Sequence, residues 1–299
     1  MKNMTWRGVM PAITTPFDEH LNIDHVFAAK HCNWLVDNGC TGIVTPGSLG
    51  ESATLTYDEK LALWSTVVKA VGDRVPVVAA IASLSTAEAV DLSKRAADAG
   101  CSGLMVLPPY VYQGDWREMK AHVEAIFRAT NLSCMLYNNP VAYGTDFLPE
   151  QICELAADHA NFEAVKESST DVRRVTWIKE LTGDRLAIFV GVDDAIVEAI
   201  AVGAVGWIAG LVNAFPRESV DLFDYAMNGE REKAISLYNW FLPLLRMDTV
   251  PKFVQLIKLV QQEVGMGNAR VRPPRLEVVG AELEEAKRVI HEALTRRVK

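Results

Sequence analysis

The stretch VPVVAAIASLSTAEAVDLSKRAADAGCSGLMVL, residues 75–107, contains one complete strand–helix–strand unit. Residues 75–81 and 103–107 are short apolar runs, and residues 86–99 between them have apolar side chains at helical spacing. Two such runs joined by an amphipathic helix are typical of parallel strands with a crossover connection. Both runs are continuously apolar rather than alternating, which indicates strands that are covered on both sides. This stretch therefore predicts an α/β fold.

The same unit recurs along most of the chain. We expect strands at residues 8–14, 41–46, 75–81, 103–107, 133–137, 162–166, 187–191 and 205–209. We expect helices between them at residues 25–37, 57–71, 86–99, 116–129, 148–157, 172–181 and 195–202. Eight such units in series predict a closed (β/α)₈ TIM barrel. A doubly wound open sheet shows the same alternation, but it usually has fewer strands and a G-x-G-x-x-G turn, whereas residues 14–18 read TTPFD.

The chain after the eighth expected strand has helical patterns and no further strand candidate. These patterns cover residues 217–227, 231–241, 250–264 and 281–295. They exceed the single closing helix that a barrel needs, which has about 12 residues on average. We therefore predict a barrel core at 1–215 and a C-terminal helical region at 216–299 that includes the closing barrel helix.

Length and charge limit the class of protein. The 299 residues can form two domains or one barrel with additions, and 49% hydrophobic with 23% charged residues is typical of a globular protein. The net charge of −8, without a basic block, argues against binding to nucleic acid or anionic membranes. Apolar stretches fall short of the ~20 residues that span a bilayer. The N-terminal residues MKNMTWRG do not resemble a secretory signal, so we expect a cytoplasmic protein.

The sequence predicts neither a disulfide scaffold nor a metal site. The five cysteines are an odd number without C-x-x-C spacing, and the six histidines lack H-x-x-x-H spacing. Asp193 and Asp194 follow the seventh expected strand and are the one candidate metal pair. No histidine or further carboxylate cluster supports them, so we expect them to cap the helix that follows.

Lys166 is the first candidate for chemistry, because active sites of such barrels lie at the carboxyl ends of the strands. It ends the apolar run 162–166. Desolvation there disfavours the ammonium form, and a neutral amine can attack a ketone to form a Schiff base. The structural alternative is an ion pair between Lys166 and Glu167 or another carboxylate at the rim. The residue alone does not choose between the two interpretations.

Two further groups lie at neighbouring strand ends. Tyr137 ends the preceding strand, about 4.8 Å away, so its phenol could reach a Lys166 adduct and move protons. The structural alternative is a buried tyrosine with a single hydrogen bond. The second strand ends in GSLGES, residues 47–52, where Gly47 and Gly50 flank Ser48. Such a turn lets backbone N–H groups converge on a small carboxylate, although G-x-x-G turns are common.

Together these segments resemble the dihydrodipicolinate synthase and N-acetylneuraminate lyase family of class I Schiff-base lyases. Residues 47–52 are similar to its G-[ST]-x-G-E loop, YNNP at 137–140 to its Y-N-x-P motif, and VKES at 165–168 to its K-[ED]-[SA] motif. The motifs occur in the family's order, and the resemblance runs from GVMPAITTPF at 8–17 to the helical tail. It implies a TIM barrel with C-terminal helices, usually a homotetramer, and no metal or organic cofactor.

The resemblance also implies roles for individual residues. Lys166 is the Schiff-base lysine, and Tyr137 is the phenol that relays protons. Ser48 and Leu49 hold the carboxylate of a 2-oxo acid, largely through backbone N–H groups. Ile208 matches a position that offers its carbonyl to the bound substrate.

Three positions depart from the lysine-biosynthesis synthase of this family. Its loop has two threonines, and the second, which relays protons, is Leu49 here. A second tyrosine after the position of Tyr110, which reaches across the subunit interface, is Val111. The arginine that binds the dicarboxylate is Ala142. We therefore expect this chain to condense aspartate semialdehyde poorly.

The combination of GSLGE at 47–51 with YNNPVAYG at 137–144 looks most like the branch that acts on Δ1-pyrroline-4-hydroxy-2-carboxylate in hydroxyproline breakdown. That branch removes water and ammonia to give 2,5-dioxopentanoate. We predict a Schiff-base lyase acting on a small 2-oxo acid or this cyclic imine. The alternatives are a 2-oxo-3-deoxy sugar acid aldolase or dehydratase, an N-acetylneuraminate-type lyase and 4-hydroxy-tetrahydrodipicolinate synthase. A 2-oxo acid binding protein is the non-enzymatic alternative.

Overall fold

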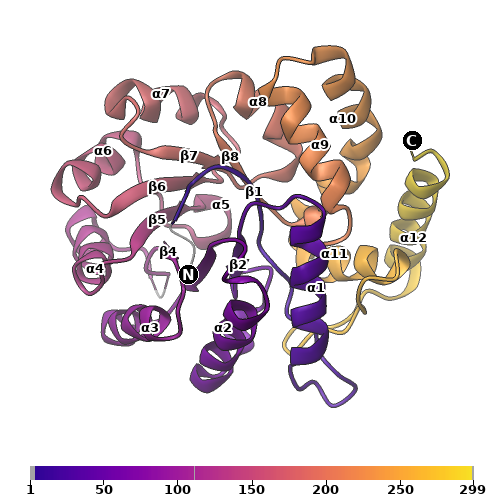
Figure 1. Ribbon diagram of the computed structural model, residues 1–299, viewed down its shortest axis with the longest axis horizontal. Coiled ribbons are helices and arrows are strands. Elements are labelled where there is room, and N and C mark those ends of the chain that lie inside the picture. Colours follow the sequence, from indigo (N-terminus) through magenta and orange to yellow (C-terminus); the bar gives the residue numbers. More distant parts are fainter. Residues whose placement is uncertain (1–3, 111, 298–299) are drawn as a thin grey trace.

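The protein is a closed barrel of eight parallel strands surrounded by helices (Figure 1). The computed structural model describes residues 4–110 and 112–297. Strands β2 to β8 pair in chain order, and β8 pairs with β1. Between β1 and β2 the ring closes through two backbone bonds, from Thr41 N to Val9 O at 2.9 Å and from Ile13 N to Val44 O at 3.0 Å. The predicted (β/α)₈ barrel is confirmed.

All eight expected strands are present. They are β1 (Gly8–Pro11), β2 (Ile43–Thr45), β3 (Val77–Ile81), β4 (Gly103–Val106), β5 (Ser133–Asn138), β6 (Phe162–Glu167), β7 (Ala187–Val190) and β8 (Gly206–Ala209). The first strand ends earlier than predicted. Beyond it, the Thr14 N–H donates to the Asn213 side chain at 3.3 Å instead of continuing a strand ladder.

The expected helices of the barrel are also present, with ends shifted by at most one residue. They are α1 (His25–Asp37), α2 (Tyr57–Val71), α3 (Thr86–Asp98), α4 (Trp116–Arg128), α6 (Pro149–Asp158), α7 (Arg173–Thr182) and α8 (Ile196–Ala201). Polar residues determine where several begin. Thr56 with Glu59 and Asp115 with Glu118 form reciprocal capping boxes at the starts of α2 and α4.

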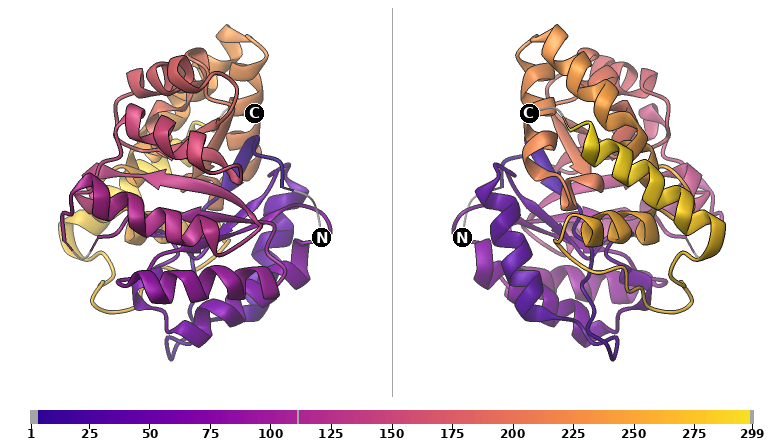
Figure 2. Two further views of the ribbon diagram at one scale, coloured as in Figure 1. Left: turned by 90° about the vertical axis from the view of Figure 1, so that its left-hand side faces the viewer. Right: turned by 90° about the vertical axis from the view of Figure 1, so that its right-hand side faces the viewer.

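Four C-terminal helices lie at one side of the barrel, beside α1 and β1 (Figure 1). They are α9 (Pro216–Met227), α10 (Arg231–Leu245), α11 (Phe253–Glu263) and α12 (Gly280–Thr295). Helix α12 crosses the outer side of this group (Figure 2). The helix expected from residue 250 begins only at Phe253, because Pro251 lies just before it. The boundary at 215/216 stays a prediction.

Several short turns were not predicted, and all of them except η4, which follows α10, come after a strand. These are α5 (Pro140–Tyr143), η1 (Ser52–Thr54), η2 (Asp193–Ala195), η3 (Leu211–Asn213) and η4 (Arg246–Asp248). In α5 the cap is Asn139, whose Oδ1 accepts a bond from Ala142 N at 3.0 Å. Segments this short have no measurable helical period, so hydrophobic patterns do not reveal them.

The barrel interior is packed at its amino end and open at its carboxyl end. Trp6 closes the amino end, where its Nε1 donates to Ser133 Oγ at 2.7 Å and its ring meets Phe189 edge-on at 6.0 Å. The Phe189 ring occupies the space that a Cβ on Gly206 would need, at 2.2 Å. Within residues 4–110 and 112–297, none of the helices has the length and apolarity of a membrane-spanning segment.

Candidate active site

A cavity of about 510 Å³ opens at the carboxyl ends of the strands. It brings together all six residues that the sequence singled out for binding or catalysis. These residues are Gly47, Ser48, Leu49, Tyr137, Lys166 and Ile208.

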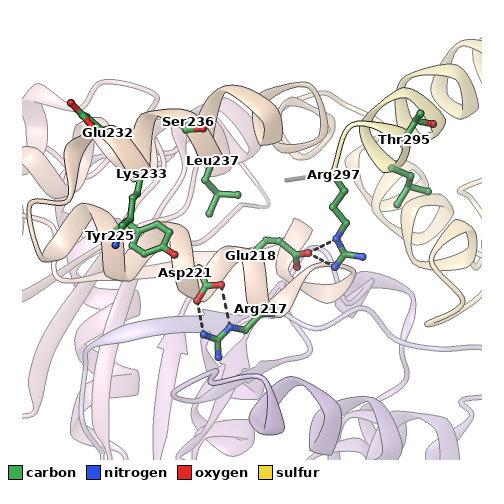
Figure 3. Close-up of a pocket in the computed structure, with 11 residues that line it drawn as sticks. Arg217, Glu218, Asp221, Tyr225, Glu232, Lys233, Ser236, Leu237, Thr295 and Arg297 are labelled. Carbon is green, nitrogen blue, oxygen red and sulfur yellow. Dashed lines mark hydrogen bonds and ion pairs between the residues drawn. The ribbon is translucent and has the colours of Figure 1, made fainter. Parts of the chain in front are cut away.

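A second hollow of about 900 Å³ lies on the outer surface between α9, α10 and α12 (Figure 3). Four of its charged side chains form two ion pairs. Arg217 bonds Asp221 at 2.9 Å, and Arg297 bonds Glu218 at 2.6 Å. Exposed pairs of this kind are ordinary surface interactions. The barrel cavity is therefore the candidate site.

Strand β6 points Lys166 into the barrel. Ala164 lies in the interior cluster and Val165 in the layer toward the helices, so the alternation of a strand places Lys166 inside. Tyr137 lies opposite Lys166 in the β5–β6 register. The Lys166 Nζ lies 4.0 Å from the centroid of the Tyr137 ring. Both side chains are buried, at 6% and 5% exposure.

The ion pair considered for Lys166 and Glu167 is not formed. Glu167 faces away from the barrel interior, where it accepts bonds from Asn138 Nδ2 at 3.1 Å and from Ser169 N at 2.7 Å. Burial raises the pKa of Glu167, and these hydrogen bonds oppose that rise. In the described residues Lys166 forms no salt bridge, although its charge opposes the raised pKa of Asp193 and of Asp248.

Gly191, just after β7, makes room for the lysine. A Cβ at this position would lie 2.1 Å from Lys166 Cε and 2.2 Å from Ser168 Oγ. Real Cβ contacts are never this short, so only glycine permits the observed course of the side chain. The Ser168 hydroxyl is buried beside the lysine without a hydrogen-bond partner among the described residues. Sequence analysis assigned no role to Ser168, although it stands in the VKES motif.

The Tyr137 hydroxyl is oriented by Asn139, whose Nδ2 donates to it at 2.9 Å. The Tyr143 ring packs edge-on against Tyr137 at 6.0 Å, and its hydroxyl is hydrogen-bonded to Ser48 Oγ. Burial raises the pKa of Tyr143, and Tyr137 adds to this effect. Sequence analysis missed the roles of Asn139 and Tyr143, which stand in YNNPVAYG but align with no motif letter.

The loop at 47–51 contributes Gly47, Ser48 and Leu49 to the lining of the cavity. In the part of the chain that the structure describes, the N–H groups of Ser48 and Leu49 have no partner. Glu51 has a left-handed backbone, with φ of 56°. Its carboxylate contacts two groups of the C-terminal region. Its Oε1 lies 2.5 Å from Lys258 Nζ, and its Oε2 accepts a bond from Arg272 N at 2.9 Å.

The expected role of Asp193 and Asp194 is wrong. Asp193 accepts bonds from Trp207 Nε1 at 3.0 Å and from Leu211 N at 2.8 Å, so it joins β8 to η3 instead of capping the helix that follows. Burial raises the pKa of Asp193 to about 6. Asp194 faces Arg246 at 3.8 Å. No group of three His, Cys, Asp or Glu side chains in the described residues could hold a metal ion.

Asp248 lines the cavity from the C-terminal region, and sequence analysis missed it. Its Oδ1 is buried without a hydrogen-bond partner among residues 4–110 and 112–297. A Cβ on Gly210 would lie 2.0 Å from this oxygen. Burial raises the pKa of Asp248 well above its usual value, Asp193 adds to this, and Lys166 opposes it. This residue lies outside every motif, so no sequence signal indicated it.

Three positions of the sequence differ from the lysine-biosynthesis synthase, and the structure describes two of them, Leu49 and Ala142. Ala142 on α5 lines the cavity and brings no polar side chain. Leu49 is buried at 3% exposure and also lines it. Tyr110 lines the cavity as well, and burial raises its pKa. Val111 lies outside the described residues.

Comparison with known proteins assigns the family. The model of the dihydrodipicolinate synthetase family matches residues 5–293. This chain belongs to the dihydrodipicolinate synthetase family. It is therefore an enzyme of the Schiff-base class I lyase type.

Relatives and solved structures match over almost the whole chain. A 4-hydroxy-tetrahydrodipicolinate synthase of Heliobacterium modesticaldum is 31% identical, over 96% of this chain and 95% of the relative. One from Acidothermus cellulolyticus is 33% identical, over 92% and 88%. The crystal structure of a dihydrodipicolinate synthase from Bacillus anthracis superposes with a TM-score of 0.92 at 31% identity, covering 99% and 100%. One from Acinetobacter baumannii, complexed with pyruvate, gives 0.92 at 25% identity, covering 97% and 99%.

Proposed function

We propose that this enzyme acts on a small 2-oxo acid or its cyclic imine through an imine on Lys166. The observation that carries the proposal is the position of the amine. Lys166 Nζ lies 4.0 Å from the Tyr137 ring centroid, buried in a cavity whose wall offers two unpaired N–H groups. A nucleophilic amine, a phenol and carboxylate donors are the groups that Schiff-base chemistry on a 2-oxo acid needs.

The loop at 47–51 binds the carboxylate next to the reacting carbon. Gly47 leaves the loop open to the cavity, and the N–H groups of Ser48 and Leu49 donate to the two oxygens. Ile208, in β8, lines the same cavity and offers its carbonyl to the substrate. This arrangement places the carbonyl carbon toward Lys166.

Tyr137 moves protons at the carbon next to the imine. A protonated imine at C2 withdraws electrons from C3, so a C3 proton or the bond to a C4 group can leave. Asn139 donates to the Tyr137 oxygen at 2.9 Å, which leaves the phenol hydrogen free to serve the substrate. The hydroxyl groups of Tyr143 and Ser48, which are hydrogen-bonded to each other, belong to the same cavity lining.

We propose Δ1-pyrroline-4-hydroxy-2-carboxylate as the substrate. Lys166 adds at C2, and the ring nitrogen departs from that carbon as an amine. Tyr137 takes a proton from C3, and the 4-hydroxyl leaves as water. Tautomerisation and hydrolysis of both imines then free the lysine, ammonia and 2,5-dioxopentanoate, so the balanced reaction consumes one water. Leu49 and Ala142 give this compact substrate an apolar wall.

The synthase reaction is the second candidate, and the named relatives favour it. Proteins 31% and 33% identical to this chain are 4-hydroxy-tetrahydrodipicolinate synthases. Against it stand Leu49 and Ala142, which cannot relay a proton or bind a second carboxylate. A panel assay with the pyrroline acid, aspartate semialdehyde plus pyruvate, sugar acids and N-acetylneuraminate separates the candidates. Highest kcat/KM with ammonia release from the pyrroline acid is expected, and highest kcat/KM with aspartate semialdehyde would show the synthase.

Borohydride trapping tests the shared chemistry. Reduction in the presence of pyruvate should add one covalent adduct to the unaltered chain, and peptide mapping should place it on Lys166. Lys166→Arg should add none, because a guanidinium does not form the imine. Lys179→Arg is the matched control on the exposed helix α7 and should be trapped normally. An adduct that persists in Lys166→Arg would refute the proposal.

A further inference from the structure

Arg275 is a half-buried arginine that lines the catalytic cavity. It lies between α11 and α12, where its backbone N–H donates to the Arg272 carbonyl at 3.2 Å. Within the described part of the chain its guanidinium has no ion pair or hydrogen bond. Other half-buried arginines are paired: Arg272 bonds both oxygens of Glu59 at 2.8 and 2.9 Å, and Arg174 bonds Asp146 at 2.6 Å.

The segment that carries Arg275 is fastened to the loop at 47–51. Arg272 N donates to the carboxylate of Glu51 at 2.9 Å, and Arg272 Nη1 donates to Thr54 O at 3.0 Å. Arg275 and Tyr143 line the same cavity. Burial raises the pKa of Tyr143, and the charge of Arg275 partly opposes that rise. The segment that carries Arg275 is therefore bonded to the loop whose residues Ser48 and Leu49 line the same cavity.

An unpaired, half-buried guanidinium is an unfavourable state that a bound anion relieves. Lys166 and Arg275 are the two cationic residues among those that line the cavity. The Lys166 amine is used to form the imine, so Arg275 remains for an anionic group. The planar fork of donors on a guanidinium matches the two oxygens of a carboxylate.

We propose that Arg275 is a specificity-determining residue that binds the substrate carboxylate adjacent to the reacting carbonyl carbon. This inference rests on the proposed function, because it takes a 2-oxo acid as the ligand. The backbone N–H groups of Ser48 and Leu49 orient the carboxylate with neutral donors. The guanidinium supplies the charge that distinguishes an acid from an uncharged ketone.

The test compares pyruvate with its uncharged amide, pyruvamide, in the Arg275→Gln variant. Borohydride trapping on Lys166 is measured as a function of ligand concentration. We expect the half-saturating concentration of pyruvate to rise about tenfold or more, because hydrogen bonds to a charged group contribute this much. The half-saturating concentration of pyruvamide should stay within about twofold of its value in the unaltered chain, because that ligand carries no charge for the guanidinium to bind.

Two control variants accompany this measurement. Arg275→Lys keeps the positive charge and loses the planar pair of donors. We therefore expect its half-saturating pyruvate concentration to lie between those of the unaltered chain and Arg275→Gln. Arg217→Gln removes an arginine that pairs with Asp221 in the outer hollow. We expect its half-saturating pyruvate concentration to equal that of the unaltered chain. Because the Arg275 side chain has no bond within the described chain, the variants should melt at the same temperature as the unaltered protein.

Three outcomes contradict the proposal in distinguishable ways. An unchanged pyruvate half-saturation in Arg275→Gln shows that the guanidinium does not bind this carboxylate. If Arg275→Gln loses affinity for a 2-oxo dicarboxylate such as 2-oxoglutarate but not for pyruvate, Arg275 binds a second, distal carboxylate instead. If the unaltered chain forms no adduct with pyruvate at all, the Schiff-base function itself has failed. An adduct that forms with normal amplitude but weaker pyruvate affinity supports both.

Discussion

Tyr143 brings a hydroxyl to the cavity from the same chain that supplies Lys166 and Tyr137. Its hydroxyl bonds Ser48 Oγ, and its ring packs against Tyr137 at 6.0 Å. The resemblance to the lysine-biosynthesis synthase of this family implies a tyrosine that reaches across the subunit interface, and the residue at that position of this sequence is Val111. We therefore expect Tyr143 to move protons in this cavity.

Tyr143→Phe should slow proton transfer without preventing imine formation. The variant keeps the ring and removes the hydroxyl next to Ser48. Exchange of the pyruvate methyl protons with deuterated solvent, followed by NMR, should slow by about tenfold or more, because positioned proton transfer contributes at least this much. Borohydride trapping on Lys166 should stay normal.

The control for this variant is Tyr112→Phe. Tyr112 is 60% exposed and bonds Glu118 at 2.8 Å, outside the residues that line the cavity. Its methyl-proton exchange should match the unaltered chain. Equal exchange rates for Tyr143→Phe and Tyr112→Phe would show that the Tyr143 hydroxyl carries no proton.

At the scale of elements, the loop after β2 depends on a buried ion pair with α11. Glu51 and Lys258 have side-chain exposures of 0% and 2%, and their charged atoms lie 2.5 Å apart. Burial lowers the pKa of Lys258 to about 8, and Glu51 opposes this by favouring the charged amine. The C-terminal region is thus joined to the loop at 47–51 through this pair.

Lys258→Met should destabilise the fold by about 3–5 kcal/mol, because it leaves the Glu51 charge buried and unpaired. Urea unfolding monitored by circular dichroism measures the change. Lys252→Met is the matched control, since Lys252 pairs with Glu282 at exposures of 51% and 45%. Its effect should be within about 1 kcal/mol.

The double variant Glu51→Gln with Lys258→Met checks the cause. Removing both charges should destabilise less than the sum of the two single changes, because no buried charge then lacks a partner. Additive losses would mean that the two side chains stabilise the loop independently of each other.

At the scale of the whole molecule, a buried histidine joins α1 to the end of the barrel. His31 Nε2 bonds the Asn213 carbonyl at 2.9 Å, and Asn213 Nδ2 donates to Ala12 O at 2.8 Å. Thr14 in the same region donates to Gln261 on α11 at 2.7 Å. These bonds connect the first strand, the η3 turn and the C-terminal helices at the seam where the barrel closes.

His31 should make the protein less stable in mild acid. Burial lowers its pKa from 6.5 to about 4, so the unfolded chain takes up a proton before the folded protein does. The stabilising contribution of neutral His31 is fully present above pH 6.5. As the pH falls toward 4, the free energy of unfolding decreases by about 3 kcal/mol. Asp193 acts in the opposite sense, because its pKa is raised to about 6.

His31→Gln isolates this effect. The stability difference between the variant and the unaltered chain should shrink by about 3 kcal/mol from pH 7 to pH 4, because glutamine does not titrate in this range. Urea unfolding at a series of pH values measures it. His20→Gln, at a side chain 76% exposed, serves as the control. A pH-independent difference for His31→Gln would contradict the expectation.

The barrel was predictable because each strand–helix unit is a local pattern. Continuous apolar runs and amphipathic segments alternate with a spacing that admits few folds, and the observed strands overlap all eight predicted ranges. Short turns such as α5 and η4 were not predictable, because three or four residues carry no period. Assembly as a homotetramer and a cytoplasmic location stay predictions.

The sequence by itself determined which strand ends carry Lys166, Tyr137 and the loop at 47–51, because motif spacing and the two-residue period of a strand are local properties. Only the tertiary structure decided that Arg275 and Asp248 line the same cavity. They lie far along the chain from the strands, and packing of the C-terminal helices against the barrel brings them there. A charge left unpaired inside a cavity is a property of that packing, so no local pattern can reveal it.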